Sequence, residues 1–296
     1  MRHFFVLFVL CPIVGFSQDR GFETRLQSLQ NTDAAFHTID GYIITSQLFE
    51  NKFDAKGLKK PARKYELNVD ELKVSDDSLG HKNYVVKSSK IIADGIVQSD
   101  TYYFVENKEK NVLVVGLSTM DDPNPAFERR FTKMLLDNAI PKSTYTTMEP
   151  DSINFAGRKF KRSSSCYWTF LNTLQCPYYG EISWSVHEKE NTASKAVAAQ
   201  FAVTKNRKNV KILQDDEVDI IFESVPVKAR KRVLDFTGVT GLLTAMSGVK
   251  TLTAYYVVAP VRGNYVACVL SYWDKDQINA SGLPPLLEEV MQLKQP

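Results

Sequence analysis

Histidine and cysteine are scarce in this 296-residue sequence, which has four of each. Neither residue type forms a cluster with metal-ligand spacing, and the sequence contains no G-x-S-x-G, no H-E-x-x-H and no glycine-rich phosphate loop. We therefore expect no metal and no cofactor. A protein that is not an enzyme is favoured, and an enzymatic function stays open.

Charge of one sign and long apolar runs are lacking as well. The formal net charge is +3, too small to indicate a polyanionic partner, and we expect no nucleic acid. No stretch reaches the ~20 apolar residues that a membrane-spanning helix needs, so no membrane span is expected. Hydrophobic residues make up 44% of the chain, enough to bury a substantial core in one large domain or two ordinary ones.

The N-terminus has the pattern of a secretory signal peptide. A short polar start precedes an apolar run from Phe4 to Val14, and small residues follow at Gly15 and Ser17. We predict that residues 1–17 are removed, with cleavage after Gln18 as the alternative, and that the mature protein is secreted or periplasmic. The other interpretation of the apolar run is a buried N-terminal strand or helix.

One long stretch of the sequence occurs twice. Residues 92–121 and 245–274 align without a gap, and the shared positions include a glycine, a tyrosine pair and a final aspartate: Gly95 and Gly248, Tyr102-Tyr103 and Tyr255-Tyr256, Asp121 and Asp274. Each copy has the pattern of a strand, a turn and a strand, followed by a short helix with proline at its start.

Two halves that each end in this way indicate a tandem duplication. The predicted fold class is α+β, with two units in which helices pack on an antiparallel sheet and each unit ends in a β-hairpin and then an α-helix. We expect domains at 18–148 and 149–296, joined by a polar linker over 144–152. The closing hairpin and helix resemble the layout of PsbP-like domains, and this resemblance covers only the end of each half.

Periodicity predicts the remaining elements. In the first half we expect a helix within 19–31, strands at 41–48, 63–69 and 84–90, and a helix that begins near Asp121. In the second half we expect a helix ending near Lys205, a short strand at 210–213, an acidic turn at 215–217, strands at 218–225 and 227–236, and a C-terminal helix that includes Leu293.

Three cysteines remain once Cys11 is removed with the signal peptide, so at most one disulfide forms within the chain. Cys166 and Cys176 are ten positions apart and can face each other across a hairpin or a loop. In an oxidising compartment we predict that they form a disulfide, the alternative being two reduced thiols. Cys268 lies within a predicted strand and is expected to be a buried, unreactive thiol.

Aromatic residues lie close to Cys176 in the sequence. Tyr178 and Tyr179 precede a glycine and lie near Trp168 and Trp184 in the sequence. We predict that Tyr178, Tyr179 and Trp184 form an exposed surface that stacks on a sugar or anchors a protein partner. The alternative is that these rings fill the core.

Basic residues form a second candidate surface. Lys228, Arg230 and Arg232 alternate along a predicted strand and so share one of its faces, where they could bind an anionic glycan or a lipid surface. A further basic cluster spans 158–162 and includes Lys159. The alternative for both is an ordinary solvated face.

These observations favour an exported, non-enzymatic, two-domain binding or assembly module of the cell envelope, with an unknown protein or glycan as partner. One alternative is a hydrolase whose site forms in the second domain or the interdomain cleft, where His187 could act with Ser183 or Ser185 and a carboxylate. The other alternative is a binder of glycans or anionic surfaces through the basic strand.

Overall fold

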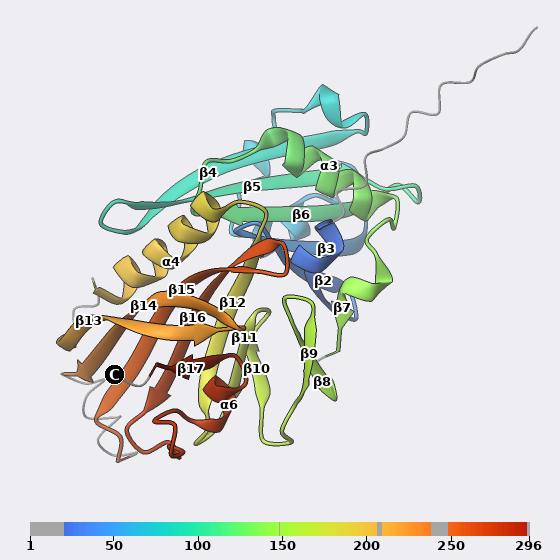
Figure 1. The fold of residues 1–296 in the computed structure, drawn as a ribbon. Coiled ribbons are helices and arrows are strands. Elements are labelled where there is room, and N and C mark those ends of the chain that lie inside the picture. Colours follow the sequence, from blue (N-terminus) through green and yellow to red (C-terminus); the bar gives the residue numbers. More distant parts are fainter. Residues whose placement is uncertain (1–20, 148, 206–208, 238–247, 295–296) are drawn as a thin grey trace, which may run out of the picture.

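The computed structural model describes residues 21–147, 149–205, 209–237 and 248–294, and the predicted signal peptide therefore lies outside the described residues. β-Strands are the commonest structure of the described chain and build two large sheets and one small hairpin, with few helices (Figure 1). The predicted α+β class is confirmed at this level.

The first sheet has seven strands in the order β4-β5-β6-β3-β2-β1-β7. Neighbouring strands are antiparallel except for β1 and β7, which are parallel. The strands are β1 Gln27–Asn31, β2 Ala34–Ile39, β3 Tyr42–Lys52, β4 Asn83–Ala93, β5 Ile96–Glu106, β6 Asn111–Thr119 and β7 Tyr145–Thr146.

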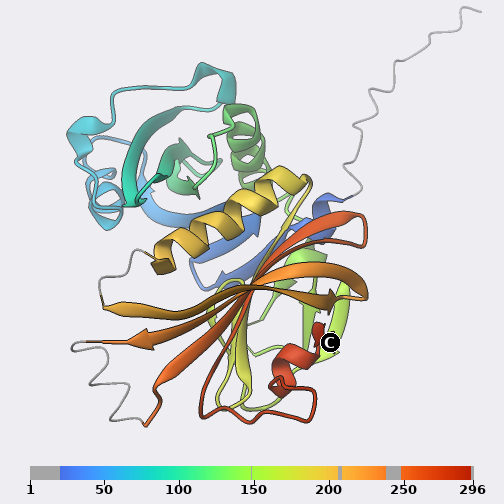
Figure 2. The ribbon, with the colours of Figure 1, turned by 60° about the vertical axis from the view of Figure 1, so that its left-hand side comes forward.

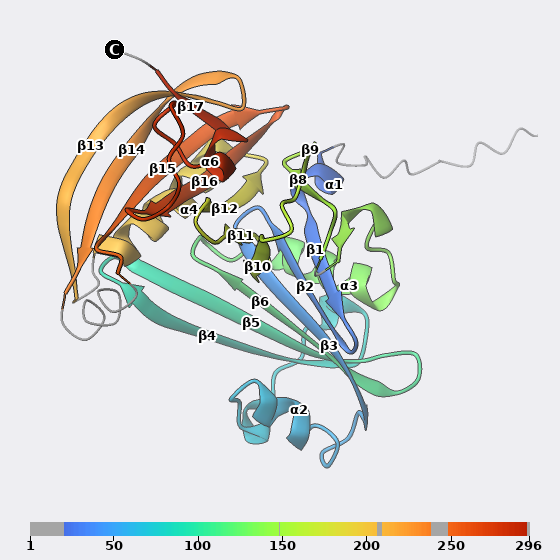
Figure 3. The ribbon, with the colours of Figure 1, turned by 90° about the horizontal axis from the view of Figure 1, so that it is seen from below.

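Helices cover both faces of the first sheet, on opposite sides (Figure 3). Alternation along β5 sends Tyr103 to one face and Phe104 to the other, because successive side chains of a strand point in opposite directions. Helix α3 (Pro125–Leu136) packs on the Tyr103 face through Phe131. Helix α2 (Lys59–Lys64) and the short helices η1 (Val69–Glu71) and η2 (Asp77–Leu79) precede β4, and α2 packs on the Phe104 face.

Local sequence explains where α3 begins. The side chain of Asn124 accepts hydrogen bonds from the backbone N–H groups of Ala126 and Phe127, as an N-cap does. Pro125 occupies the first helical position, where its missing N–H costs nothing. The helix predicted to begin near Asp121 therefore begins four residues later.

The second sheet has eight strands in the order β10-β11-β12-β16-β15-β14-β13-β17, and all neighbouring strands are antiparallel. The strands are β10 Tyr167–Phe170, β11 Thr173–Cys176, β12 Gly180–His187, β13 Val210–Phe222, β14 Val225–Phe236, β15 Thr251–Val261, β16 Asn264–Trp273 and β17 Met291–Leu293. A separate hairpin, β8 (Ser152–Phe155) and β9 (Arg158–Lys161), precedes them.

Helix α4 (Glu190–Lys205) lies between the two sheets (Figures 1 and 2). Its Phe201 ring packs edge-on against Tyr256 of β15, and its Thr204 hydroxyl accepts a hydrogen bond from the same tyrosine. The opposite face of the second sheet is covered by the one-turn helix α6 (Pro285–Glu288) and by the β8–β9 hairpin, which share one core with β12, β15 and β16.

Two predicted elements of the first half are wrong. The helix expected within 19–31 is one turn, α1 (Phe22–Arg25), followed by β1, because Ser28 and Leu29 pair with β2. The strand expected at 63–69 is instead the end of α2, a loop and the first residue of η1. Tyr65, Leu67 and Val69 alternate because their side chains pack on the core from this segment.

The acidic turn expected at 215–217 is also wrong, because β13 runs without interruption to Phe222. Asp215, Glu217 and Asp219 lie directly opposite cations of β14, in the pairs Asp215 with Arg232, Glu217 with Arg230 and Asp219 with Lys228. Opposite charges on facing positions stabilise a ladder of antiparallel strands, so a carboxylate-rich run can be a strand.

The two copies of the repeat differ in their pairing. Both are hairpins, β5–β6 and β15–β16, but Tyr103 lies opposite Val115 while its aligned counterpart Tyr256 lies opposite Val269. The cause is the turn: the backbones of Asn107 and Asn111 hydrogen-bond across three residues, whereas only Arg262 and Gly263 separate the last pair of the second hairpin. Tyr103 therefore faces α3, the helix that follows its hairpin, whereas Tyr256 faces away from α6, the helix that follows its own hairpin.

The C-terminal helix also differs from the expectation. It is limited to the single turn of α6, and Leu293, expected on its apolar side, lies in β17 and pairs with Ile220. In the first half, β7 likewise follows the terminal helix and the short helix η3 (Lys142–Thr144), and it pairs with β1.

Candidate functional site

The two sheets meet where the β2–β3 turn of the first half contacts the end of β12. The Asp40 N–H donates to the carbonyl of Val186 (3.2 Å), and the Glu188 N–H donates to the Asp40 carboxylate (2.7 Å). Arg25 forms an ion pair with Asp40 (3.0 Å). We call this set of contacts the junction. Burial raises the pKa of Asp40, and the neighbouring Arg25 opposes that shift.

Gly41 is the second residue of that turn and packs against the ring of His187. Its φ of +83° is one that residues with a Cβ rarely adopt, and a Cβ there would lie 3.5 Å from the ring carbon Cε1 of His187. Because 3.5 Å is an ordinary van der Waals contact, the backbone conformation of the turn, and not a clash with His187, favours glycine at this position.

His187 and Ser185 form a buried hydrogen bond, with 2.7 Å between Nε2 and Oγ. Burial lowers the pKa of His187 to about 4, so the ring is neutral near pH 7. The other ring nitrogen, Nδ1, is buried and has no hydrogen-bond partner among the described residues. Ser183 lies elsewhere: its hydroxyl accepts a hydrogen bond from Thr173 (3.0 Å).

Beside the junction lies a cavity of about 260 Å³, which we call the junction cavity. Its walls come from α1, β1, β7, β8, β9, β10 and β12, so both halves and the segment between them contribute. Hydroxyl groups are the largest class of polar lining group, and Ser185 is one of them. Arg25 and Lys159 bring positive charge, and among the described residues no carboxylate lines it.

Strand alternation places Lys159 in this cavity. In the β8–β9 hairpin, Ile153, Phe155 and Phe160 are buried in the core of the second half. Asn154 and Lys159 lie directly opposite each other and point to the other side, toward the junction cavity. Lys159 is exposed and forms no ion pair within the described part of the chain, whereas Arg25 is paired with Asp40.

Two tryptophans form the apolar wall of the junction cavity. The rings of Trp168 and Trp184 are tilted, with 5.7 Å between their centroids. The indole nitrogen Nε1 of Trp168 is buried and has no acceptor among the described residues. A buried donor without an acceptor costs about 1–3 kcal/mol, so an acceptor that reached this N–H would be favoured.

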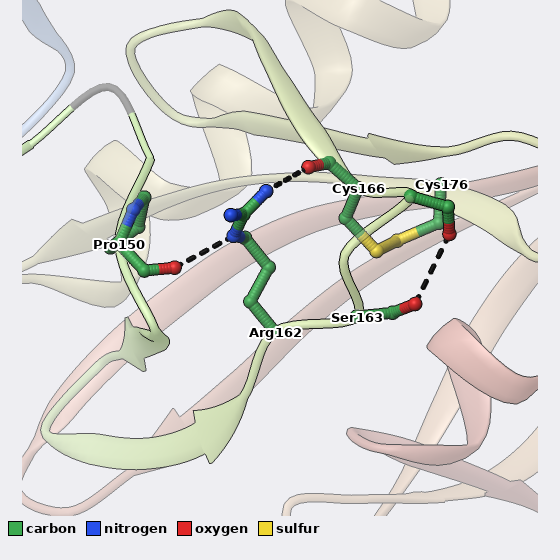
Figure 4. The surroundings of a disulfide bond; sticks show 6 residues. Pro150, Arg162, Ser163, Cys166 and Cys176 are labelled. Carbon is green, nitrogen blue, oxygen red and sulfur yellow. Dashed lines mark hydrogen bonds between the residues drawn. A yellow bond between two sulfur atoms is a disulfide. The ribbon is translucent and has the colours of Figure 1, made fainter.

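The predicted disulfide between Cys166 and Cys176 is confirmed, with 4.1 Å between the Cα atoms (Figure 4). It links the start of β10 to the end of β11. Arg162 donates to the carbonyls of Pro150 (2.7 Å) and Cys166, which ties the segment before β8 to the disulfide. The disulfide thus supports the strand that carries Trp168. Cys268 is buried, as expected, and burial raises the pKa of its thiol.

The predicted aromatic surface is not one surface. Tyr178 is 70% exposed, in a turn whose carbonyl accepts a hydrogen bond from the Gln277 N–H (2.7 Å). Tyr179 packs partly against the core, and Trp184 is only 2% exposed. Neighbouring positions in the sequence therefore place these three rings in solvent, at the core boundary and inside the core.

The predicted basic strand is neutralised by its neighbour. Lys228 pairs with Glu217 (3.4 Å), and Arg230 pairs with Asp215 (2.6 Å). Arg232 is fully buried: it pairs with Asp215 (3.2 Å), and its guanidinium lies 3.4 Å from the ring centroid of Phe201. All three cations thus have carboxylate partners within the protein, and only Lys228 and Arg230 reach solvent.

Three further hollows lie near the site. One, of about 650 Å³, is lined by the junction residues Arg25, Asp40 and Glu188. A groove of about 1110 Å³ crosses the first sheet beside the end of α3, and it carries both signs of charge, as with Lys60 and Glu50. A smaller cavity of about 120 Å³ lies under α4, between Ile43 of the first sheet and Ala196 of the helix. The largest hollow is therefore not at the junction.

The sequence indicated Ser185, His187 and Trp184, which lie in β12 next to the junction. It did not indicate the combination of Trp168 and Lys159. Trp168 belongs to the aromatic group described from the sequence, and Lys159 belongs to the basic cluster at 158–162. The alternation of β8 and β9 could have indicated that Lys159 faces away from the core. No sequence pattern indicated that the first half covers that side.

Comparison with known proteins finds no matching family model, no similar curated protein and no similar solved structure. Among the described residues, no helix is long and apolar enough to cross a membrane.

Proposed function

We propose that the protein is an exported, non-enzymatic binding module that holds a small ligand in the junction cavity. The observation that carries this proposal is the pair of unsatisfied groups at one cavity, the buried Trp168 indole N–H and the Lys159 ammonium. Binding cavities combine an apolar wall with a few converging polar groups, and this cavity has both. The disulfide and the N-terminal signal pattern support export.

The arrangement of charges favours binding over catalysis. A general base needs a partner that stabilises its protonated form, and the buried Nδ1 of His187 has none in the described structure. Asp121, whose charge acts on His187, is already paired with Lys195, and Asp40 is paired with Arg25. Among the described residues that line the junction cavity, the groups without a partner include a donor, the Trp168 N–H, and a cation, Lys159, which suit recognition of acceptors.

We also propose that the two halves, 18–148 and 149–296, derive from a duplication. The first sheet contains the order β4-β5-β6-β3-β2-β1, and the second sheet contains the order β14-β15-β16-β12-β11-β10. In both orders two meanders of three strands lie side by side, and the last strand of the later meander pairs with the last strand of the earlier one. The unequal hairpin turns mean that the halves have since diverged in register. A second partner surface at the exposed Tyr178 is compatible with this arrangement.

Thermal shift against a panel of small molecules tests the binding proposal. The panel comprises neutral sugars, acidic sugars, amino acids and short peptides, applied to the wild type and to the variants W168F and K159Q. We expect at least one compound to raise the melting temperature of the wild type and to lose that effect in both variants. A panel without any stabilising compound, or one whose effects survive in both variants, contradicts the proposal.

K161Q is the matched control. Lys161 lies on the same face of β9 as Lys159 and is likewise exposed, but it does not line the junction cavity. A ligand that depends on Lys159 should bind this variant as it binds the wild type.

The second candidate is a hydrolase, and the 2.7 Å hydrogen bond between Ser185 and His187 favours it. Ser185 lines the junction cavity, so a substrate held there could reach its hydroxyl. A fluorophosphonate probe labels an activated serine. Labelling of the wild type that is lost in S185A and retained in S183A would support this candidate, and an unlabelled wild type would remove it.

A further inference from the structure

We propose that the ligand of the junction cavity is an acidic monosaccharide unit, that is, a single sugar ring that carries a carboxylate. This inference rests on the proposed binding function and adds the chemical class of the ligand. Three properties of the cavity lead to it: the sign of its uncompensated charge, its surplus of hydrogen-bond donors, and its aromatic wall.

The first property is charge. The cavity is lined by two cations and by no carboxylate within the described ranges. Arg25 is compensated by Asp40, which lies outside the lining, while Lys159 has no ion-pair partner in the described structure. One negative charge on the ligand would therefore pair with Lys159 without displacing an existing partner. A charge-assisted hydrogen bond of this kind is about twice as strong as a neutral one.

The second property is the surplus of donors. The Trp168 N–H has no acceptor. The carbonyl oxygen of the Asn154 side chain already accepts from the Gly157 N–H, which leaves its NH₂ group to donate. Sugar hydroxyls and carboxylates supply acceptors for such donors, and sugar hydroxyls can also donate to the hydroxyl-rich lining.

The third property is size and shape. Trp168 is partly exposed and lines the cavity beside polar groups, whereas Trp184 is almost fully buried behind it. An indole beside polar groups is a combination that suits a sugar ring. The cavity volume of about 260 Å³ lies just under the range of roughly 300–1,000 Å³ typical of sites for drug-sized ligands. A single ring therefore fits better than an oligosaccharide held within the cavity.

Isothermal titration calorimetry with the full mature chain tests the ligand class. The probes are glucuronic and galacturonic acid, the neutral sugars glucose and galactose, and inorganic phosphate as an anion without a ring. We expect an acidic sugar to bind about tenfold or more tightly than its neutral counterpart, because it alone pairs with Lys159.

The variants divide the interaction into its parts. K159Q should abolish the preference for the acidic sugar while retaining the weak binding of the ring, and W168F should weaken both sugars about equally. K161Q should leave both affinities unchanged. Circular dichroism of each variant checks that its fold is retained, so that a loss of binding reports on the cavity.

Two results overturn the ligand class and leave the binding function standing. In the first, neutral and acidic sugars bind with equal affinity. In the second, phosphate binds as tightly as the acidic sugars, or a compound of another class binds in a Trp168-dependent way while the sugars do not. If no compound of the thermal-shift panel binds, the function and the ligand class fail together.

Discussion

His37 and His187 are fully buried, one in each half, and each has one ring nitrogen bonded to a serine hydroxyl. His37 bonds Ser28 (2.8 Å), and His187 bonds Ser185 (2.7 Å). Burial lowers the pKa of both rings to about 4. The remaining nitrogen of each ring has no partner among the described residues. Both histidines are therefore neutral components of the fold near pH 7.

These histidines predict a loss of stability in mild acid. Between pH 6.5 and 4 the unfolded histidine binds a proton that the folded one does not, so the free energy of unfolding falls as the pH drops through this window. The loss amounts to roughly 3 kcal/mol for each histidine. Urea denaturation at a series of pH values measures it.

The variant H187N should show a shallower pH dependence of the free energy of unfolding over the same window. H81Q is the control, because His81 is exposed and should leave the slope unchanged. A slope that stays the same in H187N would contradict the burial of a neutral ring at this position.

Strand alternation made part of the site predictable at this scale. It placed Ser185 and His187 on one face of a strand, and the structure brings them into contact. Alternation does not say what covers a face, however. Trp184 and Tyr178 both looked exposed beside a turn, yet the β8–β9 hairpin covers Trp184 through Phe155 while Tyr178 remains in solvent.

At the scale of elements, the pair β13–β14 contains a buried cation with a single carboxylate partner. Arg232 is fully buried against Phe201, and Asp215 supplies the opposite charge. In D215N this charge stays buried without a carboxylate, which should cost about 3 kcal/mol of unfolding free energy. E217Q, which breaks only the exposed pair with Lys228, should cost less than about 1 kcal/mol. Chemical denaturation of both variants measures the loss of unfolding free energy. Equal losses in D215N and E217Q would contradict the prediction.

The disulfide gives a second prediction for an element. Closing the loop between Cys166 and Cys176 stabilises the fold by roughly 2–3 kcal/mol in the chain-entropy model. A reducing agent should therefore lower the melting temperature of the wild type by several degrees. The double variant C166A/C176A should melt at the lower temperature with or without the reductant. If the reductant still lowers the melting temperature of this variant, the effect does not come from the disulfide.

Elements stabilised by local signals were predictable, and those stabilised by neighbours were not. The start of α3 at Pro125 and the hairpin turns each depend on a few residues that are adjacent in the sequence. The run 215–219 looked like a turn because carboxylates rarely favour strands, but the cations of β14 lie opposite them and compensate their charge. The missing information was the identity of the neighbouring strand.

At the scale of the whole molecule, Asp40 makes two of the polar contacts that join the halves, from its N–H to Val186 and to its carboxylate from the Glu188 N–H. Others, such as Gln27 with Leu171, lie outside the junction. D40N keeps the side-chain shape but removes the charge that pairs with the nearly buried Arg25. Opening of the junction should become about tenfold more frequent or greater, because a charge-assisted bond is replaced by a neutral one. Hydrogen exchange of the backbone amide at position 40, which bonds Val186, reports this opening.

D33N is the control for this measurement, since Asp33 is exposed in the β1–β2 turn, at the other end of β2 from Asp40, and its side chain forms no ion pair in the described structure. Equal exchange at position 40 in both variants would mean that the charge of Asp40 does not hold the halves together. The way the halves meet could not be predicted from the sequence. It depends on residues such as Asp40 and Val186, which are far apart in the chain and carry no pattern that connects them.

The position of β13 has a consequence for self-association. β17 covers its outer edge only along Ile220–Phe222, so within the described ranges most of this long strand has no partner strand at the rim of the second sheet. Such an edge can template pairing with a second copy of the chain. The run 215–219 places four carboxylates there, and two copies would bring like charges together. Asp215 and Glu217 are paired with cations of β14, whereas Asp216 and Asp219 form no ion pair in the described structure. We therefore expect the charges of Asp216 and Asp219 to oppose such pairing, and D216N/D219N to favour self-association.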